Sequence, residues 1–173
     1  MQRAALIQRD PGPEAEAAGV TNFVTSDKTY KITSKSLKSA AKAIAKRAEA
    51  GKTSWKPSFK AKMASDRTIA KATVTVKLTV LMPSWPGAED LSEAARKEWE
   101  RFYAALEAHE QGHVDLVHTH FDGMGESLVG QTAKEAKAAF RDESKQLSTA
   151  SKEFDKDTDH GRNAGTIIDI DIT

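Results

Sequence analysis

Residues 91–122 carry the strongest structural pattern in this sequence. Large apolar side chains and histidines recur there at spacings of three and four residues: Trp99, Phe102, Leu106, His109, His113, Leu116 and His120. Positions with this spacing share one face of an α-helix. The segment therefore predicts a long amphipathic helix that begins near Leu91, with Asp90 as its cap, and that Gly123 and Gly125 break. A fold built on this helix needs a second layer to cover the apolar face.

The sequence also predicts a small sheet that can form this layer. Between Thr68 and Leu81, apolar residues at positions 74, 76, 78 and 80 alternate with threonines and a lysine, the period of a strand with one buried face. Residues 20–32 suggest one or two short strands, and Thr53 opens another. Residues 166–172 alternate partly, which predicts a final strand.

Two further helices complete the expected fold. One runs from Ser34 or Ser36 to Ala50, where Gly51 ends it, and an Ala- and Lys-rich helix covers residues 132–154. Together these elements predict an α+β fold over residues 20–173: a small, mostly antiparallel sheet packed on the long helix and on a second, C-terminal helix. Residues 1–19 show no periodicity and predict a flexible leader.

Composition excludes several classes of protein. The 173 residues have a net charge of +1, so no global field favours nucleic acid or acidic lipid, and no apolar run approaches the roughly 18 residues of a membrane-spanning helix. The N-terminus has four consecutive apolar residues, too few for a signal peptide, which predicts a cytoplasmic protein or a signal-independent export route. Without cysteine, any metal must be held by His, Asp or Glu.

Lysines also follow the expected helix over residues 34–50, at positions 35, 38, 42 and 46. They describe either an anion-binding surface or an ordinary solvated helix face. The solvated face is favoured, because the apolar side of this helix is mostly alanine and lacks the aromatic residues that anchor helices to membranes.

The most informative motif lies on the long helix, in the run His109-Glu110-Gln111-Gly112-His113. Residues four apart differ by roughly 40° around a helix, so the two imidazoles can bind one metal ion. Glu110 can act as general base on a water at that ion, as in the H-E-x-x-H helix of zinc peptidases. Glycine inside a helix costs about 1 kcal/mol against alanine, so we expect a packing reason for Gly112.

Several segments resemble one bacterial family, the predicted secreted zinc-dependent proteases long catalogued as a domain of unknown function. The segments are Thr53-Ser54-Trp55, Leu81 to Trp85, Trp99 to Phe102, the H-E-x-G-H helix, and Phe154 to Gly161 with its T-x-H-G motif. The resemblance implies a zincin-like fold, Zn²⁺ as cofactor and a peptide or protein substrate, and most members are secreted or periplasmic. It favours His160 as the third zinc ligand, with Glu135 or Glu143 as alternatives.

Other polar residues near the motif have weaker claims. His118 lies on the opposite side of the helix from His109, and His120 is seven residues past His113, roughly 10 Å along the axis, so neither is expected to share the ion. Asp115 and Asp159 are either acceptors that orient an imidazole or ordinary exposed carboxylates. The tryptophans at 55, 85 and 99 are expected to anchor the core.

The sequence thus favours a zinc metallopeptidase in which His109, His113 and His160 hold the metal and Glu110 is the general base. The strand over residues 68–81, if it forms a sheet edge, can align an extended peptide. The alternative is a zinc-stabilised binding module or delivered effector cargo without catalysis. The substrate and the oligomeric state are not encoded in any recognisable pattern.

Overall fold

A computed structural model describes residues 17–172 of the chain. The expected leader falls mostly outside these residues, and the first strand already begins at Gly19. The elements, in chain order, are β1 (Gly19–Lys31), α1 (Leu37–Ala45), β2 (Lys52–Met63), β3 (Ile69–Ser84), a 3-10 turn (Pro86–Asp90), α2 (Glu93–Phe121), α3 (Met124–Leu128), α4 (Ala133–Asp157) and a second 3-10 turn (Arg162–Ala164). The fold is α+β, as predicted, and none of the described helices is long and apolar enough to cross a membrane.

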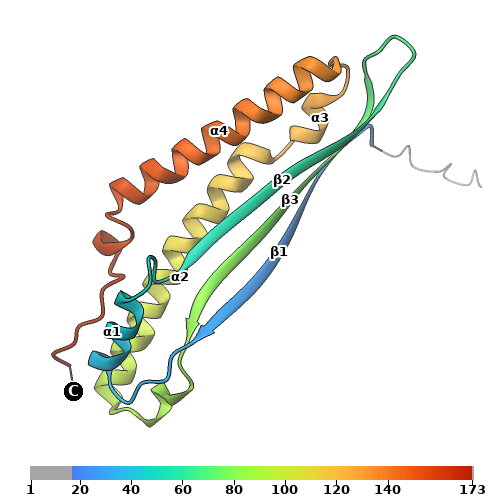
Figure 1. The fold of residues 1–173 in the computed structure, drawn as a ribbon. Helices are drawn as coiled ribbons and strands as arrows, with labels where there is room; N and C mark the ends of the chain where they lie inside the picture. Colours follow the sequence, from blue (N-terminus) through green and yellow to red (C-terminus); the bar gives the residue numbers. More distant parts are fainter. Residues whose placement is uncertain (1–16, 173) are drawn as a thin grey trace, which may run out of the picture.

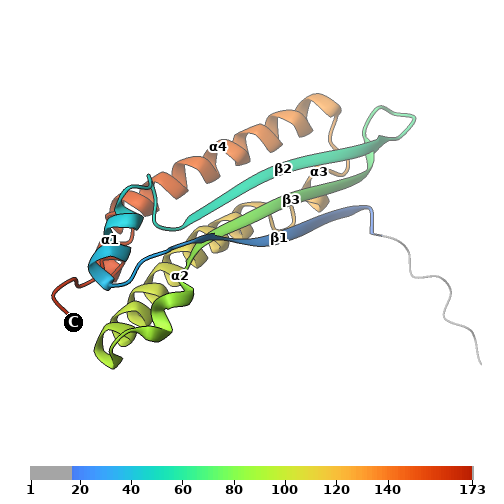
Figure 2. The same ribbon diagram turned by 60° about the horizontal axis from the view of Figure 1, so that its bottom comes forward.

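The sheet has three strands in the order β1-β3-β2 and is mixed. β1 pairs with β3 in parallel and β2 pairs with β3 antiparallel, so the expected mostly antiparallel sheet is corrected to one pairing of each kind. β3, the strand that we considered as a possible edge, lies in the centre. The long helices α2 and α4 lie on one side of this sheet (Figures 1 and 2).

The predicted alternation in β3 positions the main core. Val74, Val76 and Leu78 are buried and pack with Phe121 of α2 and Leu147 of α4. Burial of each such side chain stabilises the fold by roughly 1.5–3 kcal/mol, so this face fixes α2 and α4 against the sheet.

A second apolar cluster surrounds the first half of α2. Trp99 and Phe102 pack with Trp85, whose ring meets Trp99 edge-on at 5.2 Å, and with Leu37 of α1. Trp85 and Trp99 are therefore core anchors, as predicted, whereas Trp55 is only half-buried. The two clusters leave the middle of α2, which carries the histidine motif, between them.

The helix boundaries follow local capping signals. Ser92 rather than Asp90 caps α2, because its hydroxyl accepts a hydrogen bond from the Ala95 amide, and α2 ends at Phe121 before Gly123. At α4, Thr132 and Glu135 form a reciprocal capping box, which places the start of this helix where the sequence predicted it.

Helix α1 is shorter than expected and ends at Ala45 instead of Ala50. The residues that follow contact Tyr30 of β1 instead of continuing the helix. The Arg47 guanidinium lies 3.6 Å from the centre of the Tyr30 ring, and the Tyr30 hydroxyl donates a 2.6 Å hydrogen bond to the Ala50 carbonyl. These contacts hold residues 46–50 outside the helix and lead the chain into β2.

The expected strand over residues 166–172 does not form. Its backbone groups are bonded to side chains of α2 instead of to another strand. Arg101 donates to the carbonyls of Gly165 and Ile167, at 2.8 and 2.6 Å, and the Asp169 amide donates to Glu98. The Arg101 hydrogen bonds also lower the pKa of Glu98, so this carboxylate stays charged and holds the tail against α2.

Candidate metal centre

The two motif histidines converge on a carboxylate of α4. The Nε2 atoms of His109 and His113 lie 3.3 and 3.1 Å from Oδ1 of Asp155. Both histidines are buried and Asp155 is partly exposed, at 28%. Among the described residues, these three form the group whose ligand atoms all lie within 4.8 Å of one another.

His113 is held in one orientation by a second residue of α4. Its Nδ1 lies 3.1 Å from the Ser151 hydroxyl, which is buried. When Nδ1 carries the hydrogen and donates to Ser151, Nε2 presents its lone pair toward Asp155, as a metal ligand must. Ser151 and Asp155 are one helical turn apart and therefore serve the same imidazole from the same face of α4.

His109 is fixed by stacking rather than by a hydrogen bond. The Phe154 ring stacks on it at 5.1 Å and meets His113 edge-on at 5.0 Å. Its Nδ1 is buried without a partner in the described part of the chain. Burial and the neighbouring His113 lower the pKa of His109, which favours the neutral imidazole that binds metals.

Gly112 has the packing reason that the sequence led us to expect. A Cβ at this position would lie 2.5 Å from Cζ of Phe154. The absence of a side chain lets Phe154 reach the two imidazoles, and α4 can thereby approach α2 closely enough for Asp155 to meet both rings.

These residues fit zinc by their chemistry and their spacing. Two imidazoles and a carboxylate are a donor set of catalytic zinc sites, and the chain offers no thiolate. Ligands about 2.0–2.1 Å from a tetrahedral ion lie roughly 3.3 Å from one another. The 3.1 and 3.3 Å separations of the two Nε2 atoms from Asp155 Oδ1 match that spacing, and all three ligand atoms lie within 4.8 Å of one another.

Glu110 is buried beside the candidate metal-binding group, which consists of His109, His113 and Asp155. It is 4% exposed, and its Oε2 accepts a 2.8 Å hydrogen bond from the Thr53 hydroxyl of β2. Gly51 leaves room for it, because a Cβ there would lie 2.6 Å from Glu110 Oε1. Burial raises the pKa of Glu110, an effect that the Thr53 hydrogen bond and His113 partly offset.

The T-x-H-G segment brings His160 to the rim of the group. Thr158, His160 and Gly161 form a tight turn after α4, in which Asp159, His160 and Gly161 all have positive φ. Gly161 packs against the His109 ring, since a Cβ there would lie 3.1 Å from His109 Cγ. His160 Nδ1 lies 3.9 Å from Asp155 Oδ1, but its side chain is 73% exposed.

The alternative third ligands lie elsewhere. Glu135 is occupied in the capping box at the far end of α4, and Glu143 accepts a 2.6 Å contact from His120 Nδ1. His118 stacks on Phe23 of β1, so neither His118 nor His120 joins the group, as the sequence predicted.

The two aspartates weighed as imidazole acceptors do not contact the motif histidines. Asp115 accepts from the Gln111 amide, and Asp159 lies 4.0 Å from Arg162. Asp155 contacts both motif histidines instead. The sequence carries a signal for Asp155, because Ser151, Asp155 and Thr158 recur at spacings of four and three, which gives α4 a polar stripe.

A cleft of about 690 Å³ opens over this group. Its floor includes His109, Glu110, His113 and Asp155, and its walls come from the end of α1, the start of β2 and the tail after α4. Trp55 and the 59% exposed Ile167 give the walls apolar surface. A ligand in this cleft would contact both the carboxylate of Glu110 and the metal-binding group.

An α+β protein with a candidate metal centre in an open cleft is thus defined by the structure. Residues 27–161 match a family described as a bacterial protein of unknown function (DUF922), and this match covers more than half of the chain. The chain therefore belongs to that family, and the matched range contains the whole group from His109 to Asp155 as well as His160. Neither the curated proteins nor the solved structures give a significant match.

Proposed function

We propose that this protein is a zinc-dependent metallopeptidase with a zincin-like site. The observation that carries the proposal is the convergence of His109, His113 and Asp155 in a cleft beside Glu110. His109, His113 and Asp155 would hold the ion, with His160 at its rim. Zinc bound there supplies a Lewis acid that polarises a carbonyl and lowers the pKa of water.

Glu110 has the properties that a general base in such a site needs. It is the residue between the two histidines that faces the same cleft, and its carboxylate is oriented by Thr53. It would accept the proton of the attacking water and later donate it to the leaving amine. The Thr53 hydrogen bond restricts the carboxylate to one orientation, so the proton transfer starts from a defined geometry.

The position of β2 supports a peptide as substrate. β2 is an edge strand of the sheet, and Lys52, Thr53 and Trp55 at its start line the cleft. An edge strand offers unpaired backbone groups to an extended peptide, and Trp55 offers an apolar surface to a side chain. On sequence alone, the strand over residues 68–81 is the candidate for aligning a peptide. In the structure this strand is β3, which is central and has its backbone bonded on both sides.

A second candidate function is a zinc-stabilised binding module. The position of His160 favours it, because His160 with His109, His113 and Asp155 would complete four protein ligands. A site with four protein ligands leaves no open position for water and is typical of structural zinc.

The two functions are separated by one set of measurements. The purified protein is loaded with zinc, and its zinc content and its cleavage of a mixed peptide library are measured for wild type, Glu110→Gln and Glu107→Gln. Glu107 lies one turn earlier on α2 and is exposed, so it is the matched control.

We expect one zinc per chain in all three proteins, and cleavage only by wild type and Glu107→Gln. Wild-type cleavage that survives in Glu110→Gln would overturn the proposed mechanism. One bound zinc without cleavage of any library peptide would favour the binding module.

A further inference from the structure

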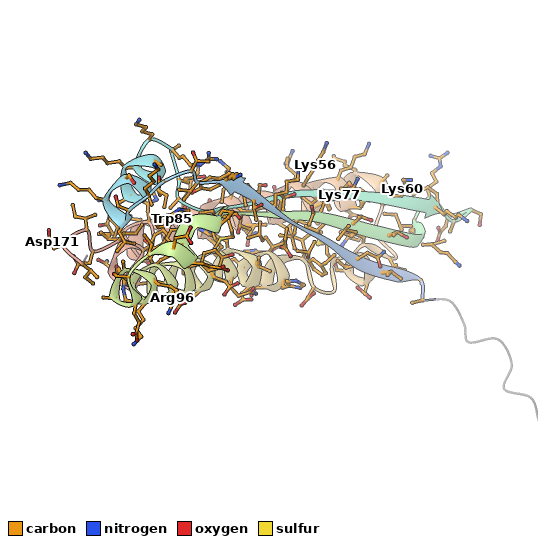
Figure 3. All side chains as sticks on the ribbon, turned by 90° about the horizontal axis from the view of Figure 1, so that it is seen from below. Lys56, Lys60, Lys77, Trp85, Arg96 and Asp171 are labelled. Atoms are coloured by element: carbon orange, nitrogen blue, oxygen red, sulfur yellow. The ribbon has the colours of Figure 1, made fainter. Side chains whose placement is uncertain are left out.

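The side of the sheet that faces away from the helices is strongly basic. Alternate residues of the strands point to this side, opposite to the buried Val74, Val76 and Leu78. They include Lys52, Lys56, Lys60 and Lys62 of β2, Lys71 and Lys77 of β3, and Lys28 of β1, all exposed, and we call this surface the lysine face. Figure 3 shows Lys56, Lys60 and Lys77 along the strands.

No acidic side chain of the three strands projects from the lysine face, although Lys52 at one end pairs with Glu49 at 3.0 Å. Asp27 is the sole acidic residue of the three strands, and it lies on the helix side, where it adds to the effects of burial and of Glu107 that raise the pKa of Tyr103 of α2. Lys56, Lys60 and Lys77 make no ion pair with any described residue. The net charge of +1 therefore conceals an uneven distribution, with a basic sheet surface and both acidic and basic residues exposed on the helices.

Protection of sheet edges explains only part of this pattern. Lysines on edge strands such as β2 discourage pairing with other chains. Lys77, however, belongs to the central strand β3, whose backbone is bonded on both sides, and it sits directly opposite Lys56. Like charges directly opposite each other in a sheet are destabilising. An anionic partner that neutralises both side chains removes this cost.

We propose that the lysine face docks this protein onto anionic lipid bilayers. Between the lysines, β2 and β3 carry the short side chains of Ser54, Ser58, Thr73, Thr75 and Thr79, so no bulky group prevents approach to an extended surface. Lys52, Lys56 and Lys60 follow one another every four residues, roughly 13 Å apart along β2. Mobile lipid headgroups can adjust to this spacing, and each lysine near such a surface contributes a similar favourable increment.

The composition of the lysine face disfavours nucleic acid. Neither an aromatic residue nor an arginine projects from it within β2 and β3, and in β1 the Tyr30 ring is covered by the Arg47 guanidinium at 3.6 Å, so the lysine face lacks open stacking surfaces for bases. Val24 of β1 is 51% exposed beside Lys77, its register partner. An exposed aliphatic side chain among lysines suits the boundary between headgroups and acyl chains.

Docking by the lysine face has a consequence for the metal centre. The metal-binding group lies between α2 and α4, on the other side of the sheet. A bilayer bound at the lysine face would therefore leave the group accessible from the side away from the membrane. Lipid binding thus does not depend on the proposed peptidase activity, and either proposal can fail alone.

Sedimentation with vesicles tests the docking. The full chain is mixed with vesicles of phosphatidylcholine alone or of equal parts phosphatidylcholine and phosphatidylglycerol. We expect binding only to the anionic vesicles, and loss of binding when salt is raised from 0.1 M to 1 M, where the Debye length falls from about 10 Å to about 3 Å. Equal binding to both kinds of vesicle, or none to either, would overturn the proposal.

Two triple variants locate the surface. Neutralising Lys56, Lys60 and Lys77 to Gln should lower the partition coefficient on the order of 100-fold. Neutralising the exposed Lys134, Lys137 and Lys145 of α4 changes the net charge equally and should leave binding nearly unchanged. Equal losses in both variants would contradict a defined lysine face, as would tight binding to duplex DNA with none to vesicles.

Melting temperatures show whether the lysine-face variant loses binding only because its fold is destabilised. Because Lys56 and Lys77 repel each other, the lysine-face variant should melt at the same temperature as wild type or higher. Loss of binding accompanied by a lower melting temperature would mean that the lysines serve the fold rather than a partner.

Discussion

Helix α2 carries two pairs of histidines that contact different partners. His109 and His113 are four residues apart, lie on the interior face and meet Asp155 of α4. His118 and His120 are two residues apart and diverge, one to Phe23 of β1 and the other to Glu143 of α4. The same residue type on the same helix thus forms a candidate metal-binding group only where helical spacing and an opposing carboxylate coincide.

The largest expected effect distinguishes the two pairs directly. His113→Ala removes one of the converging nitrogens and should reduce zinc affinity by more than the roughly 10–100-fold that loss of a supporting contact costs. His120→Ala, seven residues later, should bind zinc as wild type does. Zinc titration followed by a chromophoric chelator measures both. Equal losses would place His120 in the site and contradict the distinction.

The third ligand gives the next largest effect. Asp155 Oδ1 lies within 3.3 Å of both imidazoles, whereas His160 is mostly exposed and farther away. Asp155→Ala should therefore weaken zinc binding more than His160→Ala does, measured by the same titration. The reverse order would make His160 the third ligand and Asp155 its neighbour.

Ser151 tests the orientation of His113. Ser151→Ala removes the hydrogen-bond partner of His113 Nδ1 and should weaken zinc binding roughly 10–100-fold while the ligands remain. Ser148→Ala, on the exposed side of α4, is the control. An unchanged affinity in Ser151→Ala would mean that packing alone orients the imidazole.

Gly112 tests the approach of the two helices. The added methyl of Gly112→Ala meets Phe154, and overpacking costs about 1–3 kcal/mol, partly offset by the roughly 1 kcal/mol gain in helix propensity. We expect a net loss of up to about 2 kcal/mol in the free energy of unfolding, measured by denaturant titration. Thr119→Ala, on the exposed face near the second pair, should change stability by less than about 0.5 kcal/mol. A stabilised Gly112→Ala would show that the helices can separate freely.

The smallest effect concerns the second pair. His120 Nδ1 and Glu143 Oε1 lie 2.6 Å apart and are partly buried. Glu143→Gln should cost about 1 kcal/mol in the free energy of unfolding and leave zinc affinity unchanged. A change in zinc binding would contradict a purely structural role for this pair.

Local signals in the sequence led to most of the secondary structure. The strand with alternating valines, the long helix and the capping box at Thr132 are each encoded within a few consecutive residues. The wrong predictions concern segments whose conformation is set by contacts with residues far away in the sequence. Residues 46–50 left α1 because of Tyr30, and residues 166–172 could not form a strand because Arg101 and Glu98 bind their backbone.

Strand pairing likewise could not be predicted from local sequence patterns. The alternation in β3 showed which face is buried but gave no partner, so its central position and its parallel pairing with β1 were missed. Both edges of a strand look alike in sequence, because the backbone groups that pair are common to all residues.

The sequence by itself determined the motif. A spacing of four residues on an apolar helix face places His109 and His113 together wherever that helix packs, and Gly112 marks the point of close approach. Only the tertiary structure decided the partners of the motif. Other parts of the chain supply the residues that contact the motif: Asp155 and Ser151 of α4, Thr53 of β2, and Gly51 just before β2. These contacts depend on how the layers pack and not on any local period in the sequence.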